Sequence, residues 1–214
     1  AQFADHHGLS MPPNVVAWLG LDVEAPPRTP KRNEAGRPYF VMVGTIEARK
    51  NHLLILQAWD NLIATLGDRA PDLVVIGQRG WEAEEAIVIL DNPGPLESRI
   101  KHLPRCDDET MSALLSGARA MLMPSLIEGF GLPLAEALQL GVPVIASDLA
   151  VFREIAGDIP TYVDPLDRHA WVDAIADYSS NGTESRRQRA VISRFRAPSW
   201  SRNFAQVEAF LATL

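Results

Sequence analysis

From residue 39 onwards, short apolar runs rich in β-branched residues alternate with longer amphipathic segments. A short continuous apolar run is typical of a strand buried on both faces of a sheet, whereas apolar residues at helical spacing are typical of an amphipathic helix. The apolar runs predict strands at residues 39–43, 73–76, 99–103, 120–123, 142–146 and 161–163.

The segments between these runs predict helices. Leu53, Leu56 and Ile63 lie at helical spacing. Asn51, just before them, is a candidate N-cap, because its side-chain oxygen can accept a hydrogen bond from the first turn. The predicted helices cover residues 52–66, 81–90, 107–118, 134–140 and 149–156, and three further helical segments close the chain at 168–178, 184–194 and 201–214.

The regular alternation of strands and helices predicts an α/β fold. Parallel strands joined by right-handed helical crossovers form a Rossmann-like, doubly wound parallel sheet with helices on both faces. In such a sheet, ligands bind outside the carboxyl ends of the strands. Gly44, Gly77 and Pro124 follow three of the predicted strands, so we expect a candidate site where the loops after these strands meet.

The N-terminal part of the chain lacks this periodicity. Residues 25–36 are rich in proline and in charged side chains, which is typical of a linker. We therefore expect a linker segment over residues 1–37, one Rossmann-like domain over residues 38–198 and a C-terminal helix over residues 199–214.

The composition narrows the class of protein. The chain has 214 residues, of which 47% are hydrophobic and 22% are charged, as in an ordinary globular domain. Its formal net charge of −7 argues against a nucleic-acid binder, which needs a basic surface. Arginines gather near the C-terminus and indicate either a solvated helix face or a contact with an anionic membrane surface or partner. They are Arg186, Arg187, Arg189, Arg194, Arg196 and Arg202.

Cys106 is the only cysteine, so the chain can form no internal disulfide and suits a reducing compartment. The histidines are scattered, and His6 and His7 have no further ligand at zinc-binding spacing, so we expect no metal site. No apolar run approaches the roughly 20 residues that span a bilayer. We therefore expect a cytoplasmic protein, with the inner face of the membrane as one place where it could act.

Two cations follow the first predicted strand. Gly44 lets the backbone pass close to a ligand, and Arg49 and Lys50 follow in the same loop. Their guanidinium and ammonium groups could neutralise a pyrophosphate. An arginine–lysine pair on a surface loop is also often only solvated, so the loop by itself leaves both interpretations open.

Glu128 and Glu136 frame a second loop. Gly129, Gly131 and Pro133 specify an irregular backbone after Glu128, and Glu136 lies inside a predicted helix. The amides at this helix N-terminus can bind an anion, and carboxylates suit hydroxyl-rich ligands. The pattern therefore favours a sugar attached to a diphosphate, although two exposed glutamates beside a permissive turn would give the same sequence.

The stretch Glu128-Gly-Phe-Gly-Leu-Pro-Leu-Ala-Glu136-Ala, followed by Gly141-Val-Pro-Val, resembles the signature of the group 1 family of retaining glycosyltransferases, which have the GT-B fold. Further stretches fit the same pattern: Val43-Gly-Thr-Ile-Glu-Ala-Arg-Lys-Asn51, Pro124-Ser, Ser147-Asp and Val163-Asp-Pro165. The resemblance covers about residues 38–180.

The resemblance implies a role for each matching position. Glu128 would approach the hydroxyls of the donor sugar, Glu136 would take the ribose hydroxyls, and Lys50 would bind the diphosphate. Many family members have arginine where this chain has Thr45, so Arg49 is expected to supply the second cation. The expected catalytic residues are Glu128, Lys50 and Arg49. The expected donor-binding residues are Glu136, Gly44, Thr45, Gly77, Leu103, Arg105, Phe130, Gly131 and Leu132.

Within this set, the resemblance gives the backbone a large share of the binding. The amides of Phe130, Gly131 and Leu132 would surround the sugar and phosphate. The base would lie against the backbone near residues 103–105, with Gly77 lining the cleft. The nucleotide-diphosphate sugar is the donor substrate, and no separate cofactor is expected.

The resemblance also implies that the chain is half of an enzyme. GT-B enzymes have two Rossmann-like domains, with the acceptor on the N-terminal one and the donor on the C-terminal one. We expect this chain to be the donor-binding half, inactive without its N-terminal acceptor domain. The expected reaction transfers a hexose to a glycan or lipid-linked acceptor in polysaccharide assembly, with a peripheral contact to the membrane. The sequence of residues 44–51 resembles that of mannosyltransferases that use GDP-mannose, so mannose is the expected sugar and GDP the expected nucleotide.

Two other functions are compatible with the sequence. A nucleotide-sugar epimerase related to GT-B enzymes would need carboxylates placed for deprotonation of the sugar. A non-catalytic nucleotide-binding module would keep the fold but have little reason to keep Glu128, Glu136 and Lys50 together.

Overall fold

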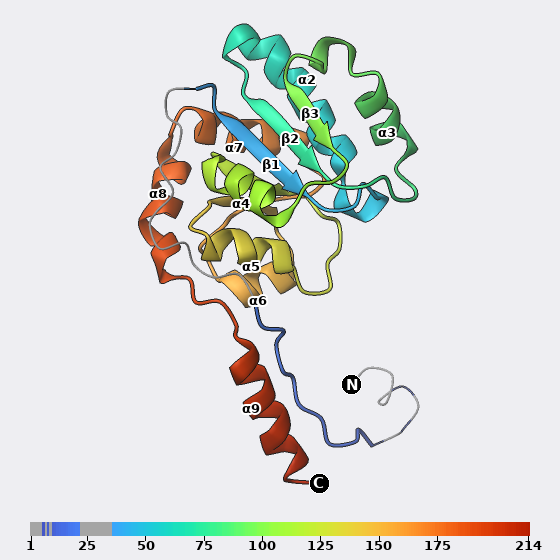
Figure 1. The fold of residues 1–214 in the computed structure, drawn as a ribbon, viewed down its shortest axis with the longest axis vertical. Helices are drawn as coiled ribbons and strands as arrows, with labels where there is room; N and C mark the ends of the chain where they lie inside the picture. The colour runs from blue at the N-terminus through green and yellow to red at the C-terminus, as the bar shows by residue number, and fades with distance from the viewer. Residues whose placement is uncertain (1–5, 7, 9, 22–35) are drawn as a thin grey trace. The chain divides into compact units, whose positions relative to one another are not determined.

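Six strands form one sheet in the order β3-β2-β1-β4-β5-β6 (Figure 1). The computed structural model describes residues 6, 8, 10–21 and 36–214, and the structural statements below concern these residues. The strands are β1 Tyr39–Val43, β2 Asp72–Ile76, β3 Ile100–Leu103, β4 Ala120–Met123, β5 Val144–Ser147 and β6 Thr161–Val163. All five neighbouring pairs are parallel. The predicted Rossmann-like, doubly wound sheet is therefore confirmed.

Helices connect the strands and cover both faces of the sheet. The helices of this region are α2 His52–Leu66, α3 Glu84–Asp91, α4 Asp108–Gly117, α5 Leu132–Gln139, α6 Ala150–Ala156, α7 Arg168–Ser179 and α8 Thr183–Val191. Helix α2 packs against α7 on one face. Helices α4 and α5 lie on the other face, in front of the sheet in Figure 1.

The core shows why β1 is apolar at every position. Phe40 and Met42 point to one face, where they join a buried cluster that includes Trp59 of α2 and Trp171 of α7. Val41 points to the other face and is also fully buried. Burying each large apolar side chain contributes roughly 1.5–3 kcal/mol, so the central strands form a rigid base for the loops at their carboxyl ends.

Several predicted elements have the expected bounds, among them β1, β4 and α2. The helix predicted at residues 81–90 begins only at Glu84, because Glu82 has a left-handed backbone with φ 54°, which an α-helix cannot contain. Asn51 does precede α2, but its side chain makes no capping hydrogen bond and its φ is 57°. The prediction of a side-chain cap at Asn51 is therefore wrong.

The strand order reverses between β1 and β4. Strands β2 and β3 extend the sheet from β1 in one direction, and β5 and β6 extend it from β4 in the other. The loop after β1 and the loop after β4 lie side by side at this point, since the amide of Leu126 donates to the carbonyl of Arg49 over 2.8 Å. This is the position where doubly wound sheets bind ligands.

Residues 10–21 and helix α9, Trp200–Leu211, belong to a smaller compact unit made of residues 1–23 and 196–214. The amide of Leu21 donates to the carbonyl of Pro198 over 3.0 Å, and the side-chain amide of Asn203 donates to the carbonyl of Trp18 over 2.8 Å. None of the α9 residues is buried.

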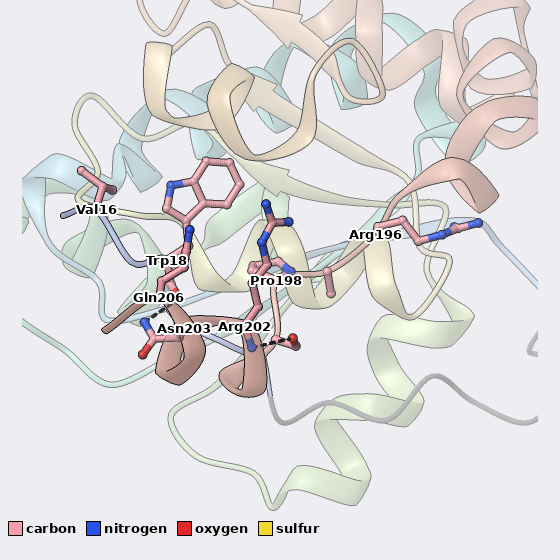
Figure 2. A pocket seen from close by; sticks show the side chains of 9 residues that line it. Val16, Trp18, Arg196, Pro198, Arg202, Asn203 and Gln206 are labelled. Atoms are coloured by element: carbon pink, nitrogen blue, oxygen red, sulfur yellow. Dashed lines mark hydrogen bonds between the residues drawn. The ribbon is translucent and has the colours of Figure 1, made fainter. Parts of the chain in front are cut away.

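This smaller unit contains a pocket of about 520 Å³ (Figure 2). Its lining combines an indole ring, two guanidinium groups and two carboxamides. The lining residues are Val16, Trp18, Arg196, Ala197, Pro198, Ser199, Arg202, Asn203 and Gln206. Among the described residues, no helix has both the length and the apolar character that crossing a membrane requires.

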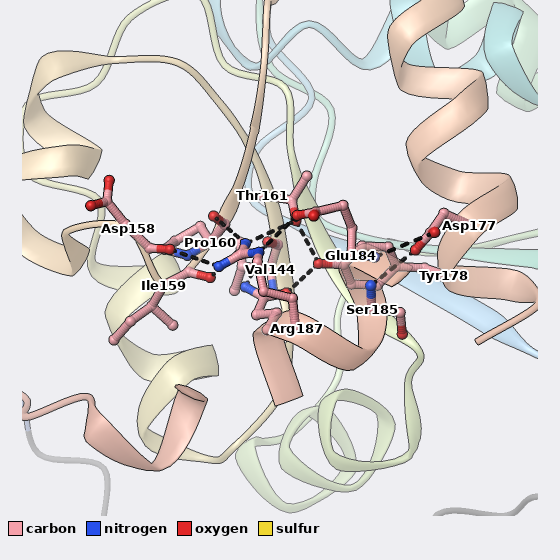
Figure 3. A network of polar contacts seen from close by, with 11 residues as sticks. Val144, Asp158, Ile159, Pro160, Thr161, Asp177, Tyr178, Glu184, Ser185 and Arg187 are labelled. Atoms are coloured by element: carbon pink, nitrogen blue, oxygen red, sulfur yellow. Dashed lines mark hydrogen bonds and ion pairs between the residues drawn. The ribbon is translucent and has the colours of Figure 1, made fainter. Parts of the chain in front are cut away.

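Arg187 of α8, one of the clustered arginines, is neither merely solvated nor free for a membrane. Its guanidinium donates to the Glu184 carboxylate over 2.8 Å and to the carbonyls of Asp158 and Pro160 over 2.9 and 3.2 Å (Figure 3). Arg187 therefore fastens α8 to the loop that leads into β6.

Gln188, the next residue, is fully buried and completes the edge of β5. Its carboxamide donates to the carbonyl of Val144 over 3.0 Å and accepts from the amide of Val144 over 3.2 Å. Strand β6 pairs with β5 only from Ile145 onwards, so the side chain of Gln188 replaces a missing strand residue at Val144. The hydroxyl of Tyr178 also donates to the Gln188 oxygen, over 2.6 Å.

Candidate functional site

The two loops at the reversal of strand order carry the predicted cations and the predicted carboxylate. Lys50 Nζ lies 2.5 Å from Glu128 Oε1, and Arg49 Nη1 lies 3.1 Å from Glu128 Oε2. The hydroxyl of Ser125 donates to Glu128 Oε1 over 2.8 Å. The Glu128 side chain is 7% exposed, so this carboxylate is held from three sides in a largely buried position. We call these four residues the switch-point cluster.

Glu47 extends the switch-point cluster and was not predicted from the sequence. Its carboxylate is 3% exposed and lies 2.6 Å from Arg49 Nη2, while the Arg49 side chain is 44% exposed. Arg49 thus bridges two buried carboxylates and keeps part of its guanidinium accessible. Formal charges balance, because Arg49 and Lys50 are offset by Glu47 and Glu128. An unpaired carboxylate is costly to bury, and an acidic residue two positions before the arginine was the available signal in the sequence.

Glycines allow the first loop to pass close to the second strand. Gly44 has φ 138°, and its amide donates to the carbonyl of Ile76 over 2.9 Å. A Cβ atom on Gly77 would lie 1.9 Å from the Gly44 carbonyl oxygen, so only glycine fits there. Lys50 then lies against Gly44, with its Cε 3.6 Å from where a Gly44 Cβ would be. Thr45, which stands where many family members have arginine, is exposed.

The second loop ends at the N-terminus of α5. Gly131 is the residue before the helix and has φ 96°, a left-handed conformation that favours glycine. A Cβ on Gly131 would lie 2.7 Å from the ring of Phe152. In the first turn of α5, Pro133 has no N–H and the Leu134 amide donates to the Gly131 carbonyl over 3.0 Å, so this end of the helix presents the Leu132 amide and the positive end of the helix dipole at the loop that carries Glu128. Phe130 is half-buried in the same loop.

Glu136 lies on α5 and is not part of the switch-point cluster. Burial raises the pKa of this half-buried carboxyl above its usual range, and the nearby charge of Asp108 raises it further. Within the part of the chain that the structure describes, its carboxylate makes no hydrogen bond or ion pair. A half-buried carboxylate in this state can accept hydrogen bonds from a neutral diol.

The expected base-binding segment lies beside Gly77. The amide of Gly77 donates to the carbonyl of Leu103 over 3.0 Å, and His102 Nε2 lies 2.9 Å from the Gly77 carbonyl oxygen. Arg105 is exposed in the loop after β3. Strand order therefore places Gly77 next to the loop after β1, and Leu103 and Arg105 lie one strand further from the switch-point cluster.

His52 is a buried polar residue that the sequence did not single out. It is 3% exposed, and neither ring nitrogen has a hydrogen-bond partner among the described residues. Burial lowers the pKa of His52 to about 4, and the charges of Lys50 and His102 contribute in the same direction. The buried ring is therefore neutral at pH 7.

The described residues contain no group of three or more His, Cys, Asp or Glu side chains that could hold a metal ion. The polar groups of the site are instead two cations, a held carboxylate and a helix N-terminus. Such an arrangement suits an anionic ligand that also carries hydroxyl groups.

Comparison with known proteins identifies the family of the chain. The family model described as glycosyl transferases group 1 matches residues 27–193, which include all six strands and the switch-point cluster. The chain belongs to this family. The resemblance drawn from its motifs is thereby confirmed.

The relatives of this group 1 domain include mannosyltransferases. The chain is 36% identical over 170 residues to the O-antigen chain mannosyltransferase B of Escherichia coli, a match that covers 76% of this chain and 43% of that protein. It is 33% identical over 124 residues to the phosphatidyl-myo-inositol mannosyltransferase of Mycolicibacterium smegmatis, covering 58% of this chain and 30% of that protein. The chain thus spans less than half the length of these relatives.

Solved structures give the same picture of the group 1 domain. Sucrose-phosphate synthase from Thermosynechococcus elongatus has a TM-score of 0.65 and 25% identity, covering 84% of this chain and 46% of that one. S. aureus TarM, in a complex that includes UDP, has a TM-score of 0.69 and 15% identity, covering 98% of this chain and 41% of that one. The second likeness shows the fold alone. The domain corresponds to part of these GT-B structures.

Proposed function

We propose that this domain binds the donor nucleotide-diphosphate sugar of a retaining glycosyltransferase that transfers a hexose. The observation that carries the proposal is the convergence of Lys50 and Arg49 on Glu128 where the strand order reverses, next to the N-terminus of α5. Cations and helix-end amides bind a diphosphate, and a held carboxylate beside them binds sugar hydroxyls.

In this proposal the switch-point cluster acts on the leaving group. Breaking the bond between sugar and diphosphate builds negative charge on the diphosphate and positive charge on the sugar. Lys50 and Arg49 are fixed in advance by their contacts with Glu128 and Glu47, so little reorganisation is needed to stabilise that charge. Electrostatic stabilisation of this kind is usually the largest catalytic contribution.

The other predicted residues bind successive parts of the nucleotide sugar, from the sugar to the base. Glu128 contacts hydroxyls of the sugar, and the backbone of Phe130, Gly131 and Leu132 surrounds the sugar and phosphate. Glu136, half-buried on the same helix, takes the ribose diol. The base lies along residues 103–105 beside Gly77.

For the donor we propose mannose carried by GDP. Two observations support this donor: residues 44–51 resemble the corresponding stretch of mannosyltransferases, and the E. coli and M. smegmatis relatives are named as mannosyltransferases. The acceptor is proposed to be a glycan or a lipid-linked glycan, bound by an N-terminal domain that the 214 residues do not include. Such an enzyme would work in the cytoplasm at the inner face of the membrane.

A calorimetric titration of the chain with GDP-mannose, UDP-glucose and ADP-glucose tests the proposal. We expect saturable binding of a nucleotide sugar, GDP-mannose most tightly. Lys50→Ala should weaken that binding about 10- to 100-fold, the loss of one charge-assisted contact, and Glu136→Ala about 10-fold. The matched controls are Lys101→Ala and Glu154→Ala, which remove exposed charges of β3 and α6 and should change affinity less than about twofold.

Two results would contradict the proposal. Absence of binding to all three nucleotide sugars would reject the donor function of this domain. Binding that survives both Lys50→Ala and Glu136→Ala unchanged would reject the site. Tighter binding of UDP-glucose or ADP-glucose would leave the function standing and replace only the base and sugar.

A further inference from the structure

Asn51 holds an unusual backbone conformation directly beside Lys50. Its φ and ψ are 57° and 38°, the left-handed region, where asparagine is tolerated better than most non-glycine residues. It ends the short helix Ala48–Lys50 and precedes α2 without capping either by its side chain. The side chain is therefore used for something else.

Both N–H groups of the Asn51 carboxamide are donated to main-chain carbonyls of other loops. One goes to Pro124 at the end of β4 over 3.1 Å, and the other goes to Pro165, after β6, over 2.9 Å. A carboxamide nitrogen has two N–H groups, so its donor capacity is used in full. These partners lie 73 and 114 residues away in the sequence, so one side chain joins the loops after three different strands.

Asn51 also closes a ring of contacts around the switch-point cluster. Pro124, which accepts from Asn51, is bonded to Ser125, and the Ser125 hydroxyl donates to Glu128. Glu128 in turn pairs with Lys50, the neighbour of Asn51. The end of the loop after β1 thus contacts the loop after β4 at two points, through Asn51 at Pro124 and through Lys50 at Glu128.

We propose that Asn51 is a positioning residue of the donor site, which fixes the Lys50 ammonium relative to Glu128 by tying the loop after β1 to the loops after β4 and β6. The proposal rests on the proposed donor function, because it assigns Asn51 to the same site. Asn51 does not touch the donor in this proposal and acts only through Lys50.

The test compares variants of the full 214-residue chain. Asn51→Gly keeps the left-handed backbone and removes the carboxamide. Asn51→Asp keeps the shape of the side chain but replaces the donating nitrogen by a carboxylate oxygen, which then faces the carbonyl oxygens of Pro124 and Pro165. Asn181→Gly is the matched control, because Asn181 has φ 58° in the distant turn between α7 and α8. Each variant is titrated calorimetrically with GDP-mannose, alone and combined with Lys50→Ala, and its melting temperature is recorded.

A positioning role predicts that Asn51→Gly weakens GDP-mannose binding about 10-fold and Asn51→Asp weakens it at least as much, while Asn181→Gly changes it less than twofold. With Lys50→Ala already present, Asn51→Gly should cause no further loss. An equal loss in both backgrounds, or no loss in either, would overturn the proposal. If Asn51→Gly fails to fold, Asn51→Asp carries the same comparison.

A second measurement separates this proposal from the donor function. The amide of Leu126 donates to the carbonyl of Arg49 across the two loops, so its hydrogen exchange reports how firmly they are joined. Asn51→Gly should accelerate exchange of that amide at least 10-fold relative to Asn181→Gly, with no ligand present. Unchanged exchange would reject the tie even if nucleotide sugars bind. Faster exchange without any nucleotide-sugar binding would reject only the donor function.

Discussion

Lys50 and Arg49 do not create a positively charged site, because Glu128 and Glu47 offset their charges. A diphosphate bound there must be recognised by N–H groups fixed in direction rather than by a general attraction. Lys50→Ala would therefore do more than delete one contact. It would leave two largely buried carboxylates facing one arginine, and the excess negative charge would repel the phosphate. This charge balance explains why the larger of the two expected losses of affinity is assigned to Lys50.

His52 gives a prediction at the scale of one residue, through pH. Its pKa is about 4 in the folded chain and 6.5 in the unfolded chain. As pH falls from 6.5 towards 4, the unfolded chain therefore binds a proton that the folded chain does not. Folding loses stability over that window, by up to about 3 kcal/mol. Above pH 6.5, the ring is neutral in both states and contributes no pH dependence.

His52→Leu should remove this acid sensitivity. We expect the free energy of unfolding, measured in urea at pH 7.5 and at pH 4.5, to fall by about 2 kcal/mol less in the variant than in the unchanged chain. Lys50 and His102 are the charged neighbours that contribute to the low pKa, and both stay in place. His169→Leu, at an exposed position of α7, controls for the loss of a histidine as such. Parallel profiles for His52→Leu and the unchanged chain would show that His52 titrates normally.

At the scale of elements, the sequence predicted what local pattern controls. The strand Tyr39–Val43 and the helix His52–Leu66 have the expected bounds, because continuous or periodic apolar residues decide burial directly. The start of α3 was wrong, since a left-handed residue such as Glu82 leaves no trace in hydrophobic periodicity. The sequence predicted that Lys50 and Glu128 lie at the same edge of the sheet, but not that their side chains form an ion pair.

Contacts between distant segments could not be predicted in this way. Asparagine is a common N-cap residue, so the sequence predicted that role for Asn51. Only its φ and its two carbonyl partners show that its side chain joins loops instead. The position of Glu47 two residues before Arg49 was a signal for a pair but not for burial, because its burial depends on how the loop after β1 folds back. Arg187 was grouped with arginines expected to be solvated or to contact a membrane or partner, and Gln188 was not singled out, because their partners in residues 144–160 lie far away along the chain.

The edge of β5 gives a prediction at this scale. Gln188→Leu should leave the amide and carbonyl of Val144 buried without partners, and each such group costs about 1–3 kcal/mol. We expect a loss of about 3 kcal/mol in the free energy of unfolding, measured in urea. Arg186→Ala, an exposed change on the same helix, should cost less than about 0.5 kcal/mol. A loss below 1 kcal/mol for Gln188→Leu would mean that β6 extends to pair with Val144.

At the scale of the whole molecule, the chain consists of two compact units of very different character. Every buried apolar residue among those described lies within residues 24–195, around the six-stranded sheet. In the smaller unit, α9 buries none of its residues, and Phe204 and Leu211 are 57% and 60% exposed. The larger unit therefore contains a complete core and the whole proposed donor site.

A fragment of residues 24–195 should consequently fold alone. Because α9 has no buried side chain, we expect its removal, together with residues 1–23, to lower stability by less than about 1 kcal/mol, or roughly 4 °C in melting temperature. The fragment should unfold in a single transition in calorimetry and bind GDP-mannose within twofold of the full chain. A control that ends at residue 187 removes Gln188 and should melt much lower, since Val144 then loses its partner. Loss of cooperative unfolding in the 24–195 fragment would instead show that residues 196–214 or 1–23 support the sheet. The core defined by the buried residues would then be incomplete.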